Sequence, residues 1–180
     1  MTILSGEIGN QTIVTDNSFH VVKIAGRAVL DGFTVTAGYA SGAAPNNNGA
    51  GIYGTCADKT LTLTNMIFNN NTASHFISTE SYDGNGGGAY LERCPFIITH
   101  VSFNNNTAVG SGGGMFSYSS SSSVMEDVSF KGNSVSSASN SWYARGGGAY
   151  LESGTYTLTN ILFNDNVAYF GGGYILVVVI

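Results

Sequence analysis

Charged side chains are scarce in this chain of 180 residues. They make up 9% of it, whereas a typical domain carries about 25%, and only six of them are Lys or Arg. Binding to a phosphate backbone requires clustered basic residues. The composition therefore argues against a nucleic-acid partner and, for the same reason, against an anionic membrane surface.

Helical periodicity is missing as well. No window repeats its apolar residues every 3.6 positions, and each of the 25 glycines would weaken a helix. The apolar segment Tyr174–Ile180 is far shorter than the roughly 20 residues that span a bilayer. Met1–Gly6 lacks the charged start and long apolar core of a signal peptide. We expect an all-β chain that does not insert into a membrane.

A repeated pattern of glycine and phenylalanine stands in place of these features. Five glycine blocks occur, and they end at Gly51, Gly88, Gly114, Gly148 and Gly173. Four Phe-x-x-Asn blocks occur, and they begin at Phe68, Phe103, Phe130 and Phe163. The gaps from glycine to phenylalanine are 17, 15, 16 and 15 residues (68−51, 103−88, 130−114, 163−148). A nearly constant gap indicates one structural unit repeated along a solenoid.

Each unit also shows the alternation of apolar and polar residues that is typical of strands. A small or polar residue that predicts a bend precedes the last strand of each unit: Asn65, His100, Asp127 and Asn160. We predict a single-stranded parallel β-helix of about five to six coils, with about three short strands per coil. Residues 1–27 would form a degenerate entry coil and 28–180 the repeated coils of the same domain. Both ends look open, so we expect a fragment of a longer exported protein, with further coils at both ends.

Stacking of the coils would place like residues in columns. The predicted inner column of rings is Phe68, Phe103, Phe130 and Phe163, and a second inner wall is Ile52, Ala89, Met115 and Ala149. An asparagine column at one turn would be Asn71, Asn106, Asn133 and Asn166. Asparagine side chains can satisfy a bent backbone and bond to the next coil. We interpret that column as structural.

The two cysteines follow successive glycine blocks, so they could lie on neighbouring coils. Adjacent coils are about 4.8 Å apart, which is within disulfide reach. However, Cys56 and Cys94 lie 5 and 6 residues after their glycines (56−51, 94−88). This mismatch favours two free thiols over a disulfide, although the residues leave both open. Neither cysteine has neighbours at metal-ligand spacing, so no metal and no cofactor are expected.

The pairing of Gly-Gly-Ala or Gly-Gly-Met with Phe-x-x-Asn resembles the repeats of chlamydial polymorphic outer-membrane proteins. It is also similar to large secreted bacterial proteins with the pectate-lyase-like fold. The resemblance covers nearly all of the chain and implies a right-handed parallel β-helix at a bacterial surface, often in adhesins and autotransported passengers. It implies an extracellular or outer-membrane location and brings no catalytic residues.

The connections from the asparagine column back to the next glycine block vary most in length. They measure 11, 15, 6 and 13 residues (49−38, 86−71, 112−106, 146−133), so the long ones leave one corner of the solenoid, where insertions commonly bind partners. Aromatic and charged side chains in them suit sugar stacking or protein anchoring. The candidates are Phe76, Tyr82, Trp142, Tyr143 and Arg145. The alternative interpretation is that these rings fold back over the coils as lids.

A second candidate is a column of rings that alternation turns outward: Tyr53, Tyr90, Phe116 and Tyr150. It could bind glycans, but a cross-strand stack that stabilises the sheet is the favoured interpretation. Glu92 and Glu152 occupy equivalent positions two coils apart, with Tyr118 between them. Their separation of roughly 9.6 Å exceeds the range for a catalytic carboxylate pair. The adjacent Arg93 could also pair with Glu92.

We therefore expect a non-enzymatic segment of a bacterial surface or secreted protein. It would act in adhesion or ligand display, with a glycan or an extracellular protein as its ligand. The alternatives are a polysaccharide lyase or hydrolase on the same fold, and a passive spacer.

Overall fold

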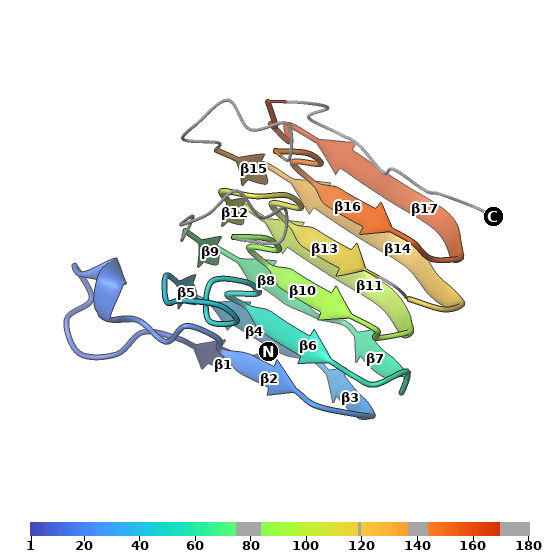
Figure 1. Ribbon diagram of the computed structural model, residues 1–180, viewed down its shortest axis with the longest axis horizontal. Coiled ribbons are helices and arrows are strands. Elements are labelled where there is room, and N and C mark those ends of the chain that lie inside the picture. Colours follow the sequence, from blue (N-terminus) through green and yellow to red (C-terminus); the bar gives the residue numbers. More distant parts are fainter. Residues whose placement is uncertain (75–83, 119, 137–143, 170–180) are drawn as a thin grey trace.

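The computed structural model of the protein describes residues 1–74, 84–118, 120–136 and 144–169. These residues form an all-β parallel solenoid of about four turns with three parallel sheets (Figure 1). The expected architecture of about three strands per coil is confirmed. The turn count is lower than the predicted five to six, because the first coil contributes only one strand, Thr2–Ser5, and the last residues lie outside the described part.

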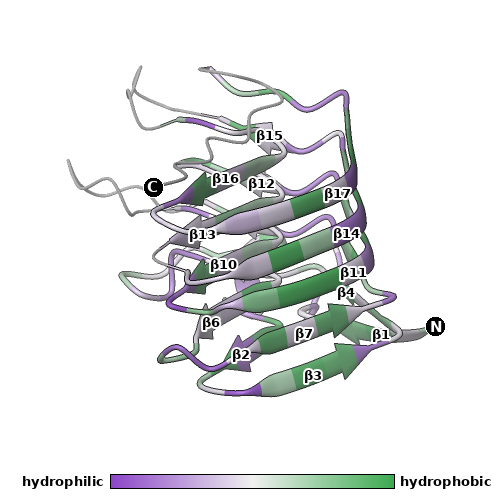
Figure 2. Ribbon diagram, turned by 90° about the vertical axis from the view of Figure 1, so that its right-hand side faces the viewer, coloured by the Kyte–Doolittle hydropathy of each residue, from purple (hydrophilic) through white to green (hydrophobic). Residues whose placement is uncertain are grey.

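The first sheet has eight strands in its pairing. They are β1 (Thr2–Ser5), β3 (Ala28–Asp31), β4 (Phe33–Thr36), β7 (Leu61–Thr64), β8 (Ile67–Asn69), β11 (Phe96–Asn104), β14 (Ser123–Lys131) and β17 (Tyr156–Asn164). Figure 2 shows β3, β7, β11, β14 and β17 stacked one above another. The sheet bends between its two halves.

The second and third sheets complete each coil. The second contains β2 (Val22–Ile24), β6 (Ile52–Thr55), β10 (Ala89–Glu92), β13 (Met115–Tyr118) and β16 (Ala149–Glu152). The third contains the two-residue strands β5 (Tyr39–Ala40), β9 (Thr72–Ala73), β12 (Thr107–Ala108) and β15 (Ser134–Val135). One short 3-10 helix, η1 (Val14–Asp16), lies before β2.

The bends in the first sheet are left-handed backbone positions. Asn65, His100, Asp127 and Asn160 have φ between 51° and 54°, where asparagine and aspartate are tolerated better than most side chains. Gly32, with φ 78°, occupies the same position in the first coil, where β3 and β4 pair with β7 and β8. In the later coils the strands continue through the bend, so two predicted short strands form one strand of nine residues.

The inner column of phenylalanines explains the constant gap. Phe68, Phe103, Phe130 and Phe163 stack with ring centroids 4.7, 4.9 and 5.0 Å apart. The last glycines of three blocks, Gly88, Gly114 and Gly148, face this column. A Cβ added to Gly88 would lie 2.9 Å from the Phe103 ring, and one added to Gly114 would lie 2.9 Å from the Phe130 ring. Glycine and phenylalanine of one coil therefore touch across the interior, and only glycine leaves room for the ring.

The asparagine column is a continuous hydrogen-bonded ladder inside the turn. The amide of Asn106 donates to Asn133 Oδ1 at 3.0 Å and to the carbonyl of Phe68 at 3.0 Å. Its own Oδ1 accepts from the backbone and side-chain nitrogens of Asn71, at 3.1 and 3.0 Å. Asn71, Asn106 and Asn133 have no exposed surface. Each side chain thus satisfies backbone groups of the turn one coil earlier and bonds to the asparagine of the next coil.

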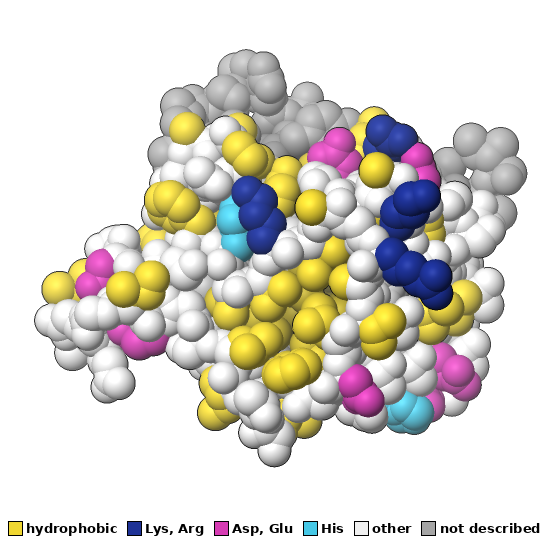
Figure 3. Space-filling model, turned by 90° about the horizontal axis from the view of Figure 1, so that it is seen from below, with side chains coloured by type: hydrophobic (Ala, Val, Ile, Leu, Met, Phe, Trp, Pro, Cys, Tyr) yellow, Lys and Arg dark blue, Asp and Glu magenta, His cyan; other side chains and the backbone are white. Residues whose placement is uncertain are grey.

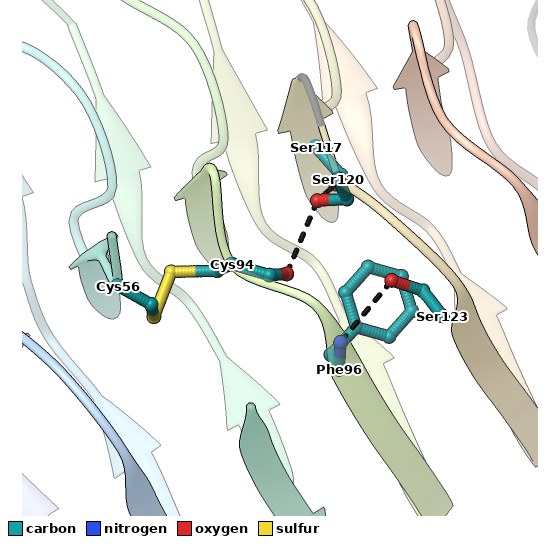
Figure 4. Close-up of a disulfide and its surroundings, with 6 residues drawn as sticks. All are labelled: Cys56, Cys94, Phe96, Ser117, Ser120 and Ser123. Carbon is teal, nitrogen blue, oxygen red and sulfur yellow. Dashed lines mark hydrogen bonds between the residues drawn. A yellow bond between two sulfur atoms is a disulfide. The ribbon is translucent and has the colours of Figure 1, made fainter. Parts of the chain in front are cut away.

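Cys56 and Cys94 form a disulfide, so the expectation of two free thiols is wrong. Their Cα atoms are 4.7 Å apart and both residues are fully buried (Figure 4). Cys56 directly follows β6, and its N–H donates to the carbonyl of Glu92. The register pairs Thr55 with Glu92, so Cys56 is level with Arg93 and the disulfide spans an offset of one residue to Cys94.

A cluster of buried hydroxyl groups continues this end of the core. Ser120 donates to the carbonyl of Cys94 at 3.1 Å, and Ser123 accepts from the N–H of Phe96 at 3.1 Å (Figure 4). Ser117 lies 3.0 Å from Ser120, Oγ to Oγ. Ser120 and Ser123 are therefore part of the packed interior, whereas Ser121 and Ser122 between them are exposed.

Candidate functional site

The corner between the third and second sheets carries four connections of unequal length (Figure 1). Residues 41–51, 74–88, 109–114 and 136–148 join β5, β9, β12 and β15 to the next strand of the second sheet. Of the candidate residues there, Phe76, Tyr82, Trp142 and Tyr143 lie outside the described residues. Arg145 is described and exposed. The structure therefore shows how the connections return to the solenoid.

The return points form a second polar ladder. Asn48 Oδ1 accepts from the N–H of Asn85 at 2.7 Å, and Asn85 Oδ1 accepts from the N–H of Ser111 at 2.5 Å. Ser111 Oγ accepts from the N–H of Arg145 at 3.3 Å. Asn48, Asn85 and Ser111 are buried. Each connection is thus fastened to its neighbour where it re-enters the stack, whatever its length.

Sequence reasoning missed this ladder, although a pattern for it exists. Each of its members directly precedes the first glycine of a block: Gly49, Gly86, Gly112 and Gly146. All four glycines have φ between 62° and 69°, a conformation that side chains rarely adopt. A polar residue before a left-handed glycine therefore recurs at the end of connections of unequal length.

The column of rings on the second sheet is buried, so its predicted exposure is wrong. Tyr53, Tyr90, Phe116 and Tyr150 retain 8%, 4%, 1% and 5% of their surface. They stack with centroids 5.5, 5.2 and 5.5 Å apart and form a cluster separate from the main core. Alternation did place them on the outer side of the sheet, but a strand pattern does not reveal what covers that side. The ring faces are packed and offer little surface to a sugar.

Polar groups close the first end of this column, which we call the tyrosine column. The imidazole of His20 stacks on Tyr53 at 4.9 Å, and the ammonium group of Lys23 lies 5.7 Å from the Tyr53 ring centroid. His20 Nδ1 lies 3.1 Å from the carbonyl of Gly49 and Nε2 lies 3.3 Å from Asn46 Oδ1. His20 therefore joins the first corner connection, residues 41–51, to the tyrosine column.

Burial shifts the titration of both aromatic groups at this end. It lowers the pKa of His20, because the charged imidazolium loses hydration and Lys23 adds repulsion, although hydrogen bonds to the carbonyl of Gly49 and to Asn46 Oδ1 act in the opposite direction. Burial raises the pKa of Tyr53, and the nearby charge of Glu92 adds to that effect. Both shifts favour the neutral forms, as a packed aromatic stack requires.

At the other end of the tyrosine column, Arg145 approaches the last ring. The Nη1 of Arg145 donates to the hydroxyl of Tyr150 at 3.4 Å. Within the column, the hydroxyl of Tyr90 donates to Glu92 Oε2 at 3.4 Å. Arg145 is the residue that fastens the last described connection to Ser111. The tyrosine column and the loop corner therefore meet at this side chain.

The two glutamates lie in one column of the second sheet, as their repeat positions indicate. The register pairs Glu92 with Tyr118 and Tyr118 with Glu152, so one coil separates the carboxylates. Arg93 forms its ion pair with Asp58, not with Glu92, since the turn after β6 carries Asp58 alongside it. Within the described ranges, no group of three His, Cys, Asp or Glu side chains could hold a metal ion.

The described part of the chain contains no helix long and apolar enough to cross a membrane. Comparisons with protein-family models, with curated proteins and with solved structures give no match. The structure shows a parallel β-solenoid. The resemblance to polymorphic outer-membrane proteins stays a prediction from the repeat.

Proposed function

We propose that this chain is a non-enzymatic, ligand-displaying segment of an extracellular surface protein. Its ligand would be a glycan or an extracellular protein, bound by the connections at the loop corner. The observation that carries the proposal is the ladder Asn48–Asn85–Ser111–Arg145. It holds the ends of connections of very different length in one fixed register, so the framework tolerates variation where contacts are made.

The rigidity of the stack favours binding. Loops held on a pre-organised framework lose less conformational freedom when they bind. The buried disulfide between Cys56 and Cys94 supports a location outside the cytosol, because disulfides persist mainly in oxidising compartments. We propose a bacterial surface or secreted protein, in line with the resemblance of the repeat.

Retention of the purified chain on a panel of glycans and extracellular-matrix proteins tests the proposal. The parent chain should be retained, and the pair Trp142→Ala and Tyr143→Ala should abolish retention. A matched control is Ile97→Ser, because Ile97 is exposed on the first sheet, away from the corner. Equal retention by the parent and the corner variant would contradict binding through this corner. Absence of retention by every variant would support the passive spacer.

Enzymatic activity needs a separate measurement. Cleavage of an acidic polysaccharide by the parent, lost in Glu92→Gln, would replace the display function by the lyase or hydrolase alternative. We expect no cleavage, since Glu92 and Glu152 are two coils apart, roughly 9.6 Å.

A further inference from the structure

The turn between the first and third sheets has the same sequence in two successive coils. Phe68–Ala73 and Phe103–Ala108 both read Phe-Asn-Asn-Asn-Thr-Ala, and they join β8 to β9 and β11 to β12 (Figure 1). The third asparagine of each segment is the buried ladder residue. The second asparagine, Asn70 or Asn105, is followed two positions later by threonine. Asn-x-Thr is the acceptor pattern of N-linked glycosylation.

Both of these second asparagines lie on the outside of the turn. Asn70 and Asn105 are exposed, with φ 54° and 52°, whereas Asn71 and Asn106 have no exposed surface. The amide nitrogens of the buried pair donate to carbonyl groups one coil earlier. Within the described residues, the side chains of Asn70 and Asn105 take part in no hydrogen bond. In each turn, the amide nitrogen of the second asparagine is therefore accessible.

The neighbouring coil leaves space beside Asn105. The strand register places Asn70, Asn105 and Gly132 on successive coils, at the coil spacing of about 4.8 Å. The side chain of Asn105 leans toward Gly132, because a Cβ added to that glycine would lie 2.6 Å from Asn105 Oδ1. Asn70 instead has the asparagine side chain of Asn105 on its next coil. Asn105 is thus the acceptor that has room for a bulky substituent.

We propose that Asn105 is an N-glycosylation site, with Thr107 as the hydroxyl residue of its acceptor sequence and the space beside Gly132 as the place of the sugar. In the transfer, Nδ2 of Asn105 attacks the anomeric carbon of a sugar activated as a phosphate ester. The bond from that carbon to the phosphate oxygen breaks as the carbon–nitrogen bond forms, so the phosphate leaves with the electron pair. The amide proton passes to a base of the transferase that brings the sugar donor.

Two other features of the chain agree with a glycan at this turn. The buried disulfide between Cys56 and Cys94 indicates an oxidising compartment, and Asn-x-Thr acceptors are typical of the surface of secreted proteins. Charged side chains are few, and Figure 3 shows them in small groups with uncharged atoms between them. A glycan is bulky and solubilising, so it supplies hydration that so few charges do not. The inference is independent of what the loop corner binds.

Peptide mapping by mass spectrometry, after exposure to two classes of sugar donor, tests the site. In one arm, the purified, folded chain is incubated with a soluble N-glycosyltransferase and UDP-glucose. In the other, the chain is secreted through the endoplasmic reticulum of cultured cells, where the donor is a lipid-linked oligosaccharide. We expect a glycan on Asn105 of the parent in at least one arm, and the arm identifies the class of donor. An unmodified Asn105 in both arms would overturn the proposal.

Variants of the acceptor sequence separate glycosylation from folding. Asn105→Asp keeps a side chain that tolerates the left-handed conformation and should abolish the glycan. Thr107→Ala should abolish it as well, whereas Thr107→Ser should retain it. Asn104→Asp is the matched control, because the residue two positions after Asn104 is asparagine, and it should leave the glycan unchanged. A glycan on Asn105 that persists in Thr107→Ala would overturn the proposal.

Gly132→Asp tests the space beside Asn105. The following coil has aspartate at this position, Asp165, with φ 53°, so the variant should keep the melting profile of a folded chain. Its new side chain would occupy the place of the sugar and should lower the glycosylated fraction. A folded Gly132→Asp variant that is glycosylated as fully as the parent would contradict the proposed place of the sugar.

Discussion

Two columns of stacked rings run along the same solenoid. The inner phenylalanine column stacks at 4.7 to 5.0 Å and faces glycine. The tyrosine column on the second sheet stacks at 5.2 to 5.5 Å and ends in polar groups, His20, Lys23 and Arg145. Parallel register alone aligns both columns, but the residues opposite each column determine how tightly it is enclosed.

Removal of one ring from each column should give the largest difference. We expect Phe103→Ala to lower the free energy of unfolding by about 4–5 kcal/mol, because glycines and strands on all sides prevent collapse into the cavity. Phe116→Ala should cost about 3 kcal/mol, since its ring packs between Tyr90 and Tyr150 in a cluster separate from the main core. Chemical denaturation measures both. A cost for Phe116→Ala equal to that for Phe103→Ala would show that the two columns are enclosed equally.

Addition of a methyl group opposite the inner column should sharpen the contrast. Gly88→Ala would meet the Phe103 ring and the backbone of the next coil, so we expect a loss of about 3 kcal/mol from overpacking. Gly26→Ala is the matched control, because nothing lies within 4 Å of its added Cβ. It should stabilise the chain by about 0.5 kcal/mol through the unfolded state. Equal effects at the two sites would contradict the contact between glycine and phenylalanine.

Loss of the disulfide should destabilise the coils that carry Tyr53 and Tyr90. Cys56→Ala with Cys94→Ala should lower the free energy of unfolding by about 2–3 kcal/mol. Addition of reductant should lower the denaturation midpoint of the parent and leave that of the double variant unchanged. Detection of free thiols in the unreduced parent would contradict the bond.

The smallest effect concerns the pH dependence at the His20 end of the tyrosine column. The folded pKa of His20 is lowered, while the unfolded chain binds its proton near pH 6.5. As pH falls through that value, the unfolded state gains more protons, so stability decreases. His20→Phe keeps the stack on Tyr53 and should flatten the stability profile between pH 7 and pH 5. His100→Gln is the control, and a profile unaltered by His20→Phe would contradict the role of burial.

The coils and bends of the fold could be predicted because the sequence repeats them. The gap from glycine to phenylalanine reports a direct contact within one coil, and the bend residues report a backbone conformation that few residue types accept. The strand register also pairs Val35 with Phe68, so the inner column continues into the preceding coil. These features repeat in every coil because each is local, so a single sequence displays them several times.

The candidate site was predicted less well, since its features arise between coils. The polar residue before each glycine block was not recognised as a ladder, because its partners lie 26 to 37 positions away. The stacking of the tyrosine column was the favoured interpretation and is observed, but its burial was not foreseen, because alternation indicates only the side of the sheet. For Arg93 the sequence suggested only its neighbour Glu92 as a possible partner, whereas the observed partner Asp58 lies 35 positions away.

The sequence by itself determined a parallel β-solenoid, the positions of its bends, and the residues that form its columns. Periodic contacts within and between equal coils impose these features, so their spacing is written in the chain. Only the tertiary structure decided that Cys56 and Cys94 bond and that the outer rings are buried. It also decided that Asn48, Asn85 and Ser111 hold the corner together. These outcomes depend on contacts between coils, and because the coils differ in length, no constant spacing in the sequence relates the residues that meet.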